Sequence, residues 1–264
     1  MIVELADGTP MYANTGGRGF DPSLPVVVLV HGAGGDHTTW RAQTRYLAHH
    51  GFAPLAVDLP GHGRSGGAHG DGIEARADAI VALLDALGVG EAALVGHSMG
   101  SLAVLDVAGR FPDRASALVL VATSPRMAVH PVLIESASAG DDRCLELTRA
   151  WQHGSAAGGD PEPGAWRAGI DWRTTEAVGL DVYADDFVAC KSWTDAAERA
   201  ASVTCPSLVI SGSADRMTGQ AAGAVVAEVL GCEHLVLDVG HMIPQEAPWP
   251  VTQRLVSFLG NPGL

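Results

Sequence analysis

One short segment, residues 92–107, constrains the fold of this chain more than any other. The apolar run Ala92-Ala93-Leu94-Val95 predicts a buried strand, and the apolar-periodic stretch from Leu102 to Val107 predicts a helix. Between them lies Gly96-His97-Ser98-Met99-Gly100, in which a glycine stands two residues from the serine on either side. Glycines permit a turn in which the backbone passes too close to its neighbours for Cβ atoms. The segment therefore predicts a strained strand–turn–helix unit that presents the Ser98 hydroxyl above a sheet.

A serine hydroxyl needs a base to act as a nucleophile, and the base needs a group that orients it. Serines on such a turn are followed along the chain by an acid and then by a histidine. The apolar run 207–210 leads to Asp215, and the run 234–237 leads to His241. Both residues follow predicted strands, at the edge where open α/β sheets place their chemistry. We interpret Ser98, Asp215 and His241 as a catalytic triad. The alternative for Asp215 is a helix-cap or turn aspartate, and the alternative for His241 is a buried loop histidine.

A second glycine-rich loop follows the β-branched run at residues 26–30. Its sequence, His31-Gly32-Ala33-Gly34-Gly35, lets the backbone approach a ligand closely. The phosphate-binding patterns Gly-Lys-Ser/Thr and Gly-x-Gly-x-x-Gly are absent from this loop. Acyl transfer needs one N–H donor after the nucleophile and a second from this kind of loop. We assign these oxyanion donors to the backbone of Met99 and Ala33, with Gly34 as an open alternative to Ala33.

Five motifs in fixed order make the chain resemble the α/β-hydrolase-fold serine hydrolases, of the small esterase-like kind. The motifs are HGAGG at 31–35, DLPGHGRS at 58–65, GHSMG at 96–100, GSADRM at 212–217 and GHMIPQEAP at 240–248. The resemblance implies an α/β fold: a mostly parallel twisted sheet flanked by helices, with a helical cap inserted after the sixth strand. It also implies a serine hydrolase for carboxylic esters of short to medium acyl chain, acting through an acyl-enzyme without cofactor or metal.

The fold serves several reactions, so the substrate stays open. Carbon–carbon bond hydrolases of ring-cleavage pathways and lactonases have a similar loop and capped layout. Some proteins of the fold are ligand receptors in which hydrolysis is vestigial. A serine at the turn disfavours haloalkane and epoxide chemistry, for which relatives use a carboxylate. We expect a small-molecule ester as the substrate.

Strand and helix patterns alternate on both sides of a central insertion. After a predicted hairpin around Asp7-Gly8, the expected strands lie near 26–30, 53–57, 91–95, 117–121, 207–211 and 234–238. The expected helices lie near 38–50, 72–88, 99–110, 219–230 and 247–259. This alternation predicts a mostly parallel sheet covered on both faces. We assign residues 1–123 and 202–264 to this core.

Residues 124–201 lack β-branched runs and contain a glycine- and proline-rich break at 154–164. We expect them to form a helical cap over Ser98. Four of the six tryptophans lie here, and each either builds the core of the cap or lines an apolar pocket. The candidate substrate-binding residues are His31, Gly32, Gly34, Met127, Trp151, Trp166, Trp172, Trp193 and Met242.

The composition disfavours several kinds of binding partner. The net charge of −14 disfavours nucleic acid, whose phosphates need a basic surface. The four cysteines lack metal-ligand spacing, and we expect reduced thiols and no metal site. The first residues do not resemble an export signal, and no apolar run is long enough to span a membrane. We therefore expect a cytoplasmic protein, monomeric or homodimeric, without a membrane partner.

Overall fold

The structure, a computed structural model, describes residues 1–153 and 167–260. In these residues an eight-stranded sheet has the order β1-β2-β4-β3-β5-β6-β7-β8. The strands are β1 (Ile2–Glu4), β2 (Pro10–Asn14), β3 (Val26–Val30), β4 (Ala53–Val57), β5 (Ala92–His97), β6 (Ala115–Val121), β7 (Ser207–Gly212) and β8 (Glu233–Leu237). β1 and β2 form the predicted antiparallel hairpin, β2 pairs antiparallel with β4, and β4, β3, β5, β6, β7 and β8 pair in parallel. The predicted α/β fold class is confirmed.

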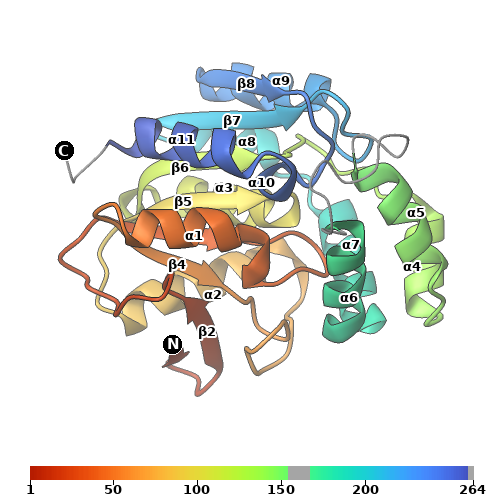
Figure 1. Cartoon of the computed structure of the whole chain (residues 1–264), viewed down its shortest axis with the longest axis horizontal. Coiled ribbons are helices and arrows are strands. Elements are labelled where there is room, and N and C mark those ends of the chain that lie inside the picture. The colour runs from red at the N-terminus through yellow and green to blue at the C-terminus, as the bar shows by residue number, and fades with distance from the viewer. Residues whose placement is uncertain (154–166, 261–264) are drawn as a thin grey trace.

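Helices cover both faces of this sheet (Figure 1). On one face lie α1 (Arg41–Ala48) and α11 (Pro248–Leu259), and on the other lie α2 (Gly72–Ala86), α3 (Met99–Arg110) and α9 (Gln220–Leu230). Two short 3-10 helices, η1 (His37–Trp40) and η2 (Pro112–Arg114), and the four-residue α10 (Ile243–Glu246) complete the core.

Strand β3 shows why the sheet needs cover on both faces. All five of its residues are buried, and successive side chains point to opposite faces. Val28 and Val30 join the apolar core beneath α2 and α3, whereas Val27 and Leu29 join the core beneath α1 and α11. A continuous apolar run of this kind is typical of a parallel strand buried between two helical layers.

Two predicted helices are divided in the structure. The predicted helix 38–50 is the 3-10 helix η1 followed by α1, and Asp36 caps η1 by accepting a hydrogen bond from the Thr38 N–H (2.8 Å). The predicted helix 247–259 is preceded by the separate short helix α10. Pro248 begins α11, where its missing N–H is not needed. Among the described residues, no helix has both the length and the apolarity to cross a bilayer.

Among the described residues between β6 and β7 there are five helices: α4 (Pro131–Ser138), α5 (Arg143–Gln152), α6 (Arg167–Val178), α7 (Leu180–Ser192) and α8 (Ala196–Ser202). The first four gather beyond one end of the sheet strands (Figure 1). Helices α4, α5 and α7 share an apolar cluster that includes Leu133, Leu145 and Phe187. Helix α8 instead packs against α3 and α9 in the main core. The last part of the predicted cap therefore lies on the core, and the break at 154–164 lies outside the described residues.

Trp193 is a tryptophan of the insertion whose role, in the core or at the substrate, can be tested by mutation. Its side chain is 4% exposed and belongs to the main apolar core, which also includes Ala196 and Ala200 of α8. We expect Trp193→Ala to lower the free energy of unfolding by about 3–5 kcal/mol, because it leaves a large cavity in the core. Urea denaturation measures this change. A large increase in KM at a temperature where the variant is folded would instead place Trp193 at the substrate.

Candidate active site

The turn between β5 and α3 has the strained geometry that its sequence predicts. Ser98 has φ +52° and ψ −121°, a conformation that a residue with a side chain rarely adopts. A Cβ on Gly96 would lie 2.2 Å from the Gly100 carbonyl oxygen, and one on Gly100 would lie 2.4 Å from the His31 carbonyl oxygen. The Ser98 N–H donates to the Val121 carbonyl oxygen of β6 (2.9 Å). These contacts hold the half-buried Ser98 at the start of α3.

The structure brings Ser98, His241 and Asp215 together in one hydrogen-bonded series. The distance from Ser98 Oγ to His241 Nε2 is 2.9 Å, and the distance from His241 Nδ1 to Asp215 Oδ2 is also 2.9 Å. A neutral imidazole that donates from Nδ1 to the carboxylate presents the Nε2 lone pair to the hydroxyl. This arrangement can take a proton from Ser98 as the hydroxyl attacks a carbonyl carbon.

Asp215 is held as an ionised acceptor. Its Oδ1 accepts hydrogen bonds from the N–H groups of Met217 (2.7 Å) and Thr218 (3.1 Å), and its Oδ2 accepts one from the Thr218 hydroxyl (2.6 Å). Burial opposes ionisation, but the neighbouring His241 and these donors together lower the pKa of Asp215 below its ordinary value. Asp215 is not the cap of α9, because Gly219 occupies the N-cap position. It does brace its own turn through the Met217 and Thr218 N–H groups, in addition to its bond to His241.

His97, beside the nucleophile, is buried and neutral. Its Nε2 donates to the His241 carbonyl oxygen (2.9 Å), which ties the turn to the loop that carries His241. Burial and the nearby His241 lower the pKa of His97 to about 3. Its Nδ1 is buried without a hydrogen-bond partner, so only one of its ring nitrogens is satisfied. His97 also lines the cavity at Ser98.

The loop after β3 is folded by its own side chains and by the insertion. His31 Nδ1 donates to the Gly32 carbonyl oxygen (2.8 Å), and His31 Nε2 accepts from the Leu59 N–H (3.1 Å). Burial, with the charge of the nearby His62, lowers the pKa of His31 to about 4, which agrees with this neutral tautomer. The Gly34 N–H donates to Asp186 Oδ2 of α7 (2.8 Å). The Gly34 amide is thus already bonded, which favours Ala33 as the loop's candidate oxyanion donor.

A narrow cavity of about 40 Å³ opens at Ser98 between the core and the insertion. His241, Ala33, Tyr183 and Met217 are among the residues around it. The polar residues that line it, apart from the triad and His97, are Thr38, Thr39, Gln152, Asp171, Thr174, Thr175, Tyr183 and Gln245. By the usual volume that one water needs, it has room for a few water molecules. The cavity fits a small, partly polar group.

Of the predicted substrate-binding residues, Gly32, Gly34 and Met242 line this cavity. The others that are described have different positions: His31 is fully buried at the start of the loop, and Met127 and Trp193 belong to the main core. Trp151 and Trp172 pack against the apolar cluster of α4, α5 and α7, and Trp166 lies outside the described residues. The three described tryptophans thus build cores, because bulky apolar rings bury most area there.

Sequence reasoning missed Asp186, which lies under the loop after β3. Asp186 is on α7 at helical spacing from Val182 and Cys190, so the sequence places a carboxylate on an apolar face. A buried carboxylate needs hydrogen-bond or charge partners, so a carboxylate at this spacing could have indicated a buried polar site. Which partners it would find could not be predicted, because they come from three distant segments of the chain.

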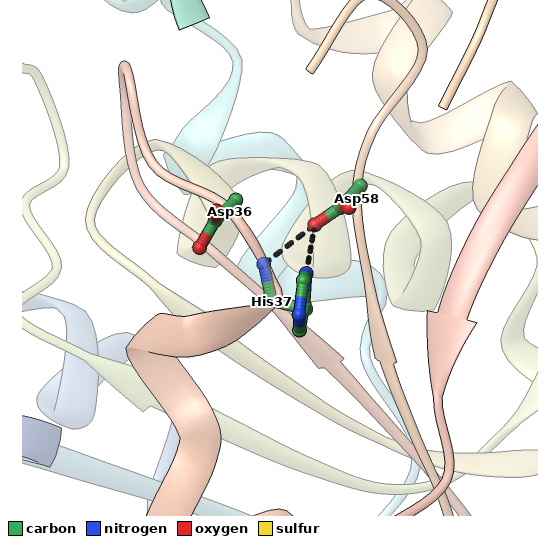
Figure 2. A group of neighbouring side chains, drawn as sticks. All are labelled: Asp36, His37 and Asp58. Atoms are coloured by element: carbon green, nitrogen blue, oxygen red, sulfur yellow. Dashed lines mark hydrogen bonds and ion pairs between the residues drawn. The ribbon is translucent and has the colours of Figure 1, made fainter. Parts of the chain in front are cut away.

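Asp58, His37 and Asp36 form the one cluster of potential metal ligands in the described part of the chain (Figure 2). Asp58 Oδ1 accepts from the backbone N–H (2.6 Å) and the Nδ1 (2.8 Å) of His37, and its Oδ2 accepts from the Arg64 N–H (2.9 Å). Asp36 is occupied as the cap of η1. Because N–H groups occupy the oxygen lone pairs that a cation would use, we assign this cluster a structural role in bracing the two loops.

Comparison with known families agrees with this fold. The family model described as the alpha/beta hydrolase fold matches residues 25–158, about half of the chain. The chain belongs to the α/β hydrolase fold family. The match includes β3, the loop after it, β5 and the turn at Ser98.

Individual relatives carry different activities in their names. The chain is 42% identical over 124 residues to the dihydrolipoyllysine-residue acetyltransferase component of the acetoin cleaving system of Pseudomonas putida, a match covering 44% of this chain and only 33% of that protein. It is 29% identical to epoxide hydrolase A of Mycobacterium tuberculosis, covering 90% of this chain and 91% of that protein. The enol-lactonase structure from Burkholderia xenovorans LB400 superposes with a TM-score of 0.87 at 25% identity, covering 98% and 99% of the two chains.

The His62 side chain gives a pH-dependent prediction. Its Nδ1 faces the Pro60 carbonyl oxygen (3.0 Å) and its Nε2 faces Asp186 Oδ2 (2.9 Å), so both nitrogens must donate and the ring is an imidazolium. Burial opposes this charge, but Asp186 outweighs it and the pKa of His62 is raised. A raised pKa in the folded state stabilises the protein below the unfolded value of about 6.5, and this contribution is lost as pH rises through the folded value.

We therefore expect the free energy of unfolding to fall more steeply from pH 6 to pH 9 for the wild type than for His62→Gln. Urea denaturation at both pH values measures it. His49→Gln, at an exposed histidine, is the control and should follow the wild type. Parallel pH dependence of the wild type and His62→Gln would contradict an imidazolium at His62.

Proposed function

We propose that this chain is a serine hydrolase that cleaves carboxylic esters through an acyl-enzyme. The observation that carries the proposal is the hydrogen-bonded series Ser98–His241–Asp215, set on a strained turn at the mouth of a cavity. In this proposal Ser98 is the nucleophile, His241 the general base and acid, and Asp215 the group that orients the imidazole.

The first half-reaction forms the acyl-enzyme. Ser98 Oγ attacks the ester carbonyl carbon while its proton passes to His241 Nε2. The negative charge that develops on the carbonyl oxygen is stabilised by the N–H groups of Met99 and Ala33. Met99 begins α3, where the first N–H groups have no acceptor within the helix. The tetrahedral intermediate collapses as His241 returns the proton to the departing alcohol oxygen.

The second half-reaction releases the acid. Water loses a proton to His241 as its oxygen attacks the acyl carbon, and the intermediate expels Ser98 Oγ, which regains a proton from the imidazolium. Asp215 stays ionised throughout and stabilises the imidazolium, since its hydrogen bonds lower its pKa. One relative is named as an epoxide hydrolase. Epoxide chemistry in this fold uses a carboxylate as the nucleophile, whereas a serine at this position favours formation of an acyl ester.

A lactone is the second candidate substrate. Its ester bond would react by the same two steps, with the alcohol remaining tethered to the acyl group. The observation that favours it is the likeness to the enol-lactonase structure over nearly the whole of both chains. Cyclic esters therefore belong in the same assay panel, and a higher kcat/KM for lactones than for matched open esters would select this alternative.

The nucleophile assignment has a direct test. We expect Ser98→Ala to fold normally and to lose about 10³- to 10⁶-fold in kcat, because the covalent route is removed. Hydrolysis of p-nitrophenyl acetate measures the loss, and a fluorophosphonate probe should label the wild type but not the variant. Ser101→Ala, one turn further along α3, is the control and should still be labelled. Labelling of Ser98→Ala at another serine would refute the assignment.

The cavity size predicts selectivity for acyl chain length. Each methylene that fits gains about 0.8 kcal/mol, and the gain ends when the cavity is full. We expect kcat/KM for p-nitrophenyl esters to be highest at about two to four acyl carbons, because the cavity holds only a few water volumes. It should fall sharply beyond about eight carbons. A maximum at palmitate, with activation at an oil–water interface, would contradict both the cavity argument and the short-chain proposal.

A further inference from the structure

The loop that would supply the second oxyanion donor is held by one side chain of the insertion. Gly34, next to Ala33, has φ +61°, and a Cβ there would lie 2.6 Å from the Tyr183 ring and 2.8 Å from the Thr175 methyl group. The loop therefore lies directly against α6 and α7. At this contact the Gly34 N–H donates to Asp186 Oδ2 (2.8 Å).

Asp186 accepts from three directions and is fully buried. Besides Gly34, its Oδ2 accepts from His62 Nε2 (2.9 Å), and its Oδ1 accepts from Arg76 Nη2 of α2. Arg76 is 1% exposed and also donates to the Gly72 carbonyl oxygen (2.8 Å). The carboxylate thus joins four segments: α7, the loop after β3, the loop after β4, and α2.

The buried network around Asp186 contains equal numbers of positive and negative side chains. His62 and Arg76 are cations, and Asp186 and the nearby Asp58 are anions. The neutral His31 ring lies 4.9 Å from the His62 ring. Burial opposes the charge on Asp186, but His62, Arg76 and the Gly34 N–H together lower its pKa to about 2.

A buried ionic network is weak evidence for stability alone, because well-packed apolar residues often stabilise as much. What an apolar residue cannot do is accept a hydrogen bond from the backbone of the loop. The Asp186 carboxylate accepts this hydrogen bond and is itself held by two cations, His62 and Arg76. The Gly34 peptide therefore has one defined orientation. Misplacement of reacting groups by as little as about 1 Å costs large factors in rate.

We propose that Asp186 is a positioning residue, which clamps the Gly34 amide so that the preceding amide of Ala33 stays directed at the oxyanion. This inference rests on the proposed ester hydrolysis. It makes α7 part of the support of the oxyanion hole, and it removes Gly34 as a donor to the substrate.

Asp186→Asn tests the clamp. The amide keeps the side-chain shape but has one acceptor oxygen for the three donors, and its NH2 group must face either Arg76 or the Gly34 and His62 donors. The acceptor of the Gly34 N–H is then no longer held in place by two cations. Because loss of a whole oxyanion donor costs about 10²- to 10³-fold, we expect kcat to fall about 10- to 100-fold with KM changed less than about threefold. The affinity for a trifluoromethyl ketone, whose hemiketal oxyanion occupies the same donors, should fall by the same factor as kcat/KM.

Asp106→Asn is the matched control. Asp106 of α3 is also fully buried and also accepts from two cations, Arg110 Nε (2.6 Å) and Arg199 Nε (2.8 Å), but it does not bond the loop. We expect both variants to lower the thermal stability, and we expect Asp106→Asn to keep kcat and ketone affinity within about twofold. Unchanged kcat and ketone affinity in folded Asp186→Asn would overturn the proposal and leave Asp186 a structural residue.

Asp186→Glu covers the case in which the asparagine variant does not fold. It keeps the charge for His62 and Arg76 but moves the acceptor by one methylene, so the same selective loss of kcat and ketone affinity is expected. Wild-type-like values in Asp186→Glu would likewise overturn the proposal. Failure of the proposed function is distinguishable, because a wild type that neither hydrolyses esters nor reacts with the fluorophosphonate refutes both proposals at once.

Discussion

The close approach of the turn at Ser98 to strand β3 is the contact on which the candidate site depends. A side chain on Gly96 or Gly100 would overlap backbone atoms, so only glycine allows the turn to sit there. The strain at Ser98 persists because β5, β6 and α3 fix both sides of it. The same approach brings the start of α3 next to the loop after β3.

Buried carboxylates link the segments around this contact. Asp215 orients the His241 ring, Asp58 braces η1 against the loop after β4, and Asp186 joins α7 to the loop after β3. Each accepts backbone N–H groups as well as side-chain donors. A carboxylate without such donors would be costly to bury, so these groups help to fix the relative positions of the loops they join. The relatives of this chain carry names of several activities, as is usual for a fold that serves many reactions.

The sequence predicted the fold class because its signals were local. The continuous apolar run of β3 and the glycine spacing around Ser98 each specify one backbone geometry regardless of what surrounds them. The roles of the tryptophans could not be read in this way. Trp193 fills the main core and Trp172 the cluster of α4, α5 and α7, whereas threonines line the cavity. An apolar ring satisfies any buried site of sufficient volume, so its sequence position does not say which one it fills.

The sequence by itself determined the order of strands and helices, the strained turn, and the identity of the serine, acid and histidine candidates. Each of these follows from residues close together in the chain. The tertiary structure decided the distances among Ser98, His241 and Asp215, the size and polarity of the cavity, and the four-segment network around Asp186. Asp186 and Gly34, which meet in this network, are 152 positions apart in the sequence. Such contacts depend on how whole helices pack, and no local pattern of side chains encodes that packing.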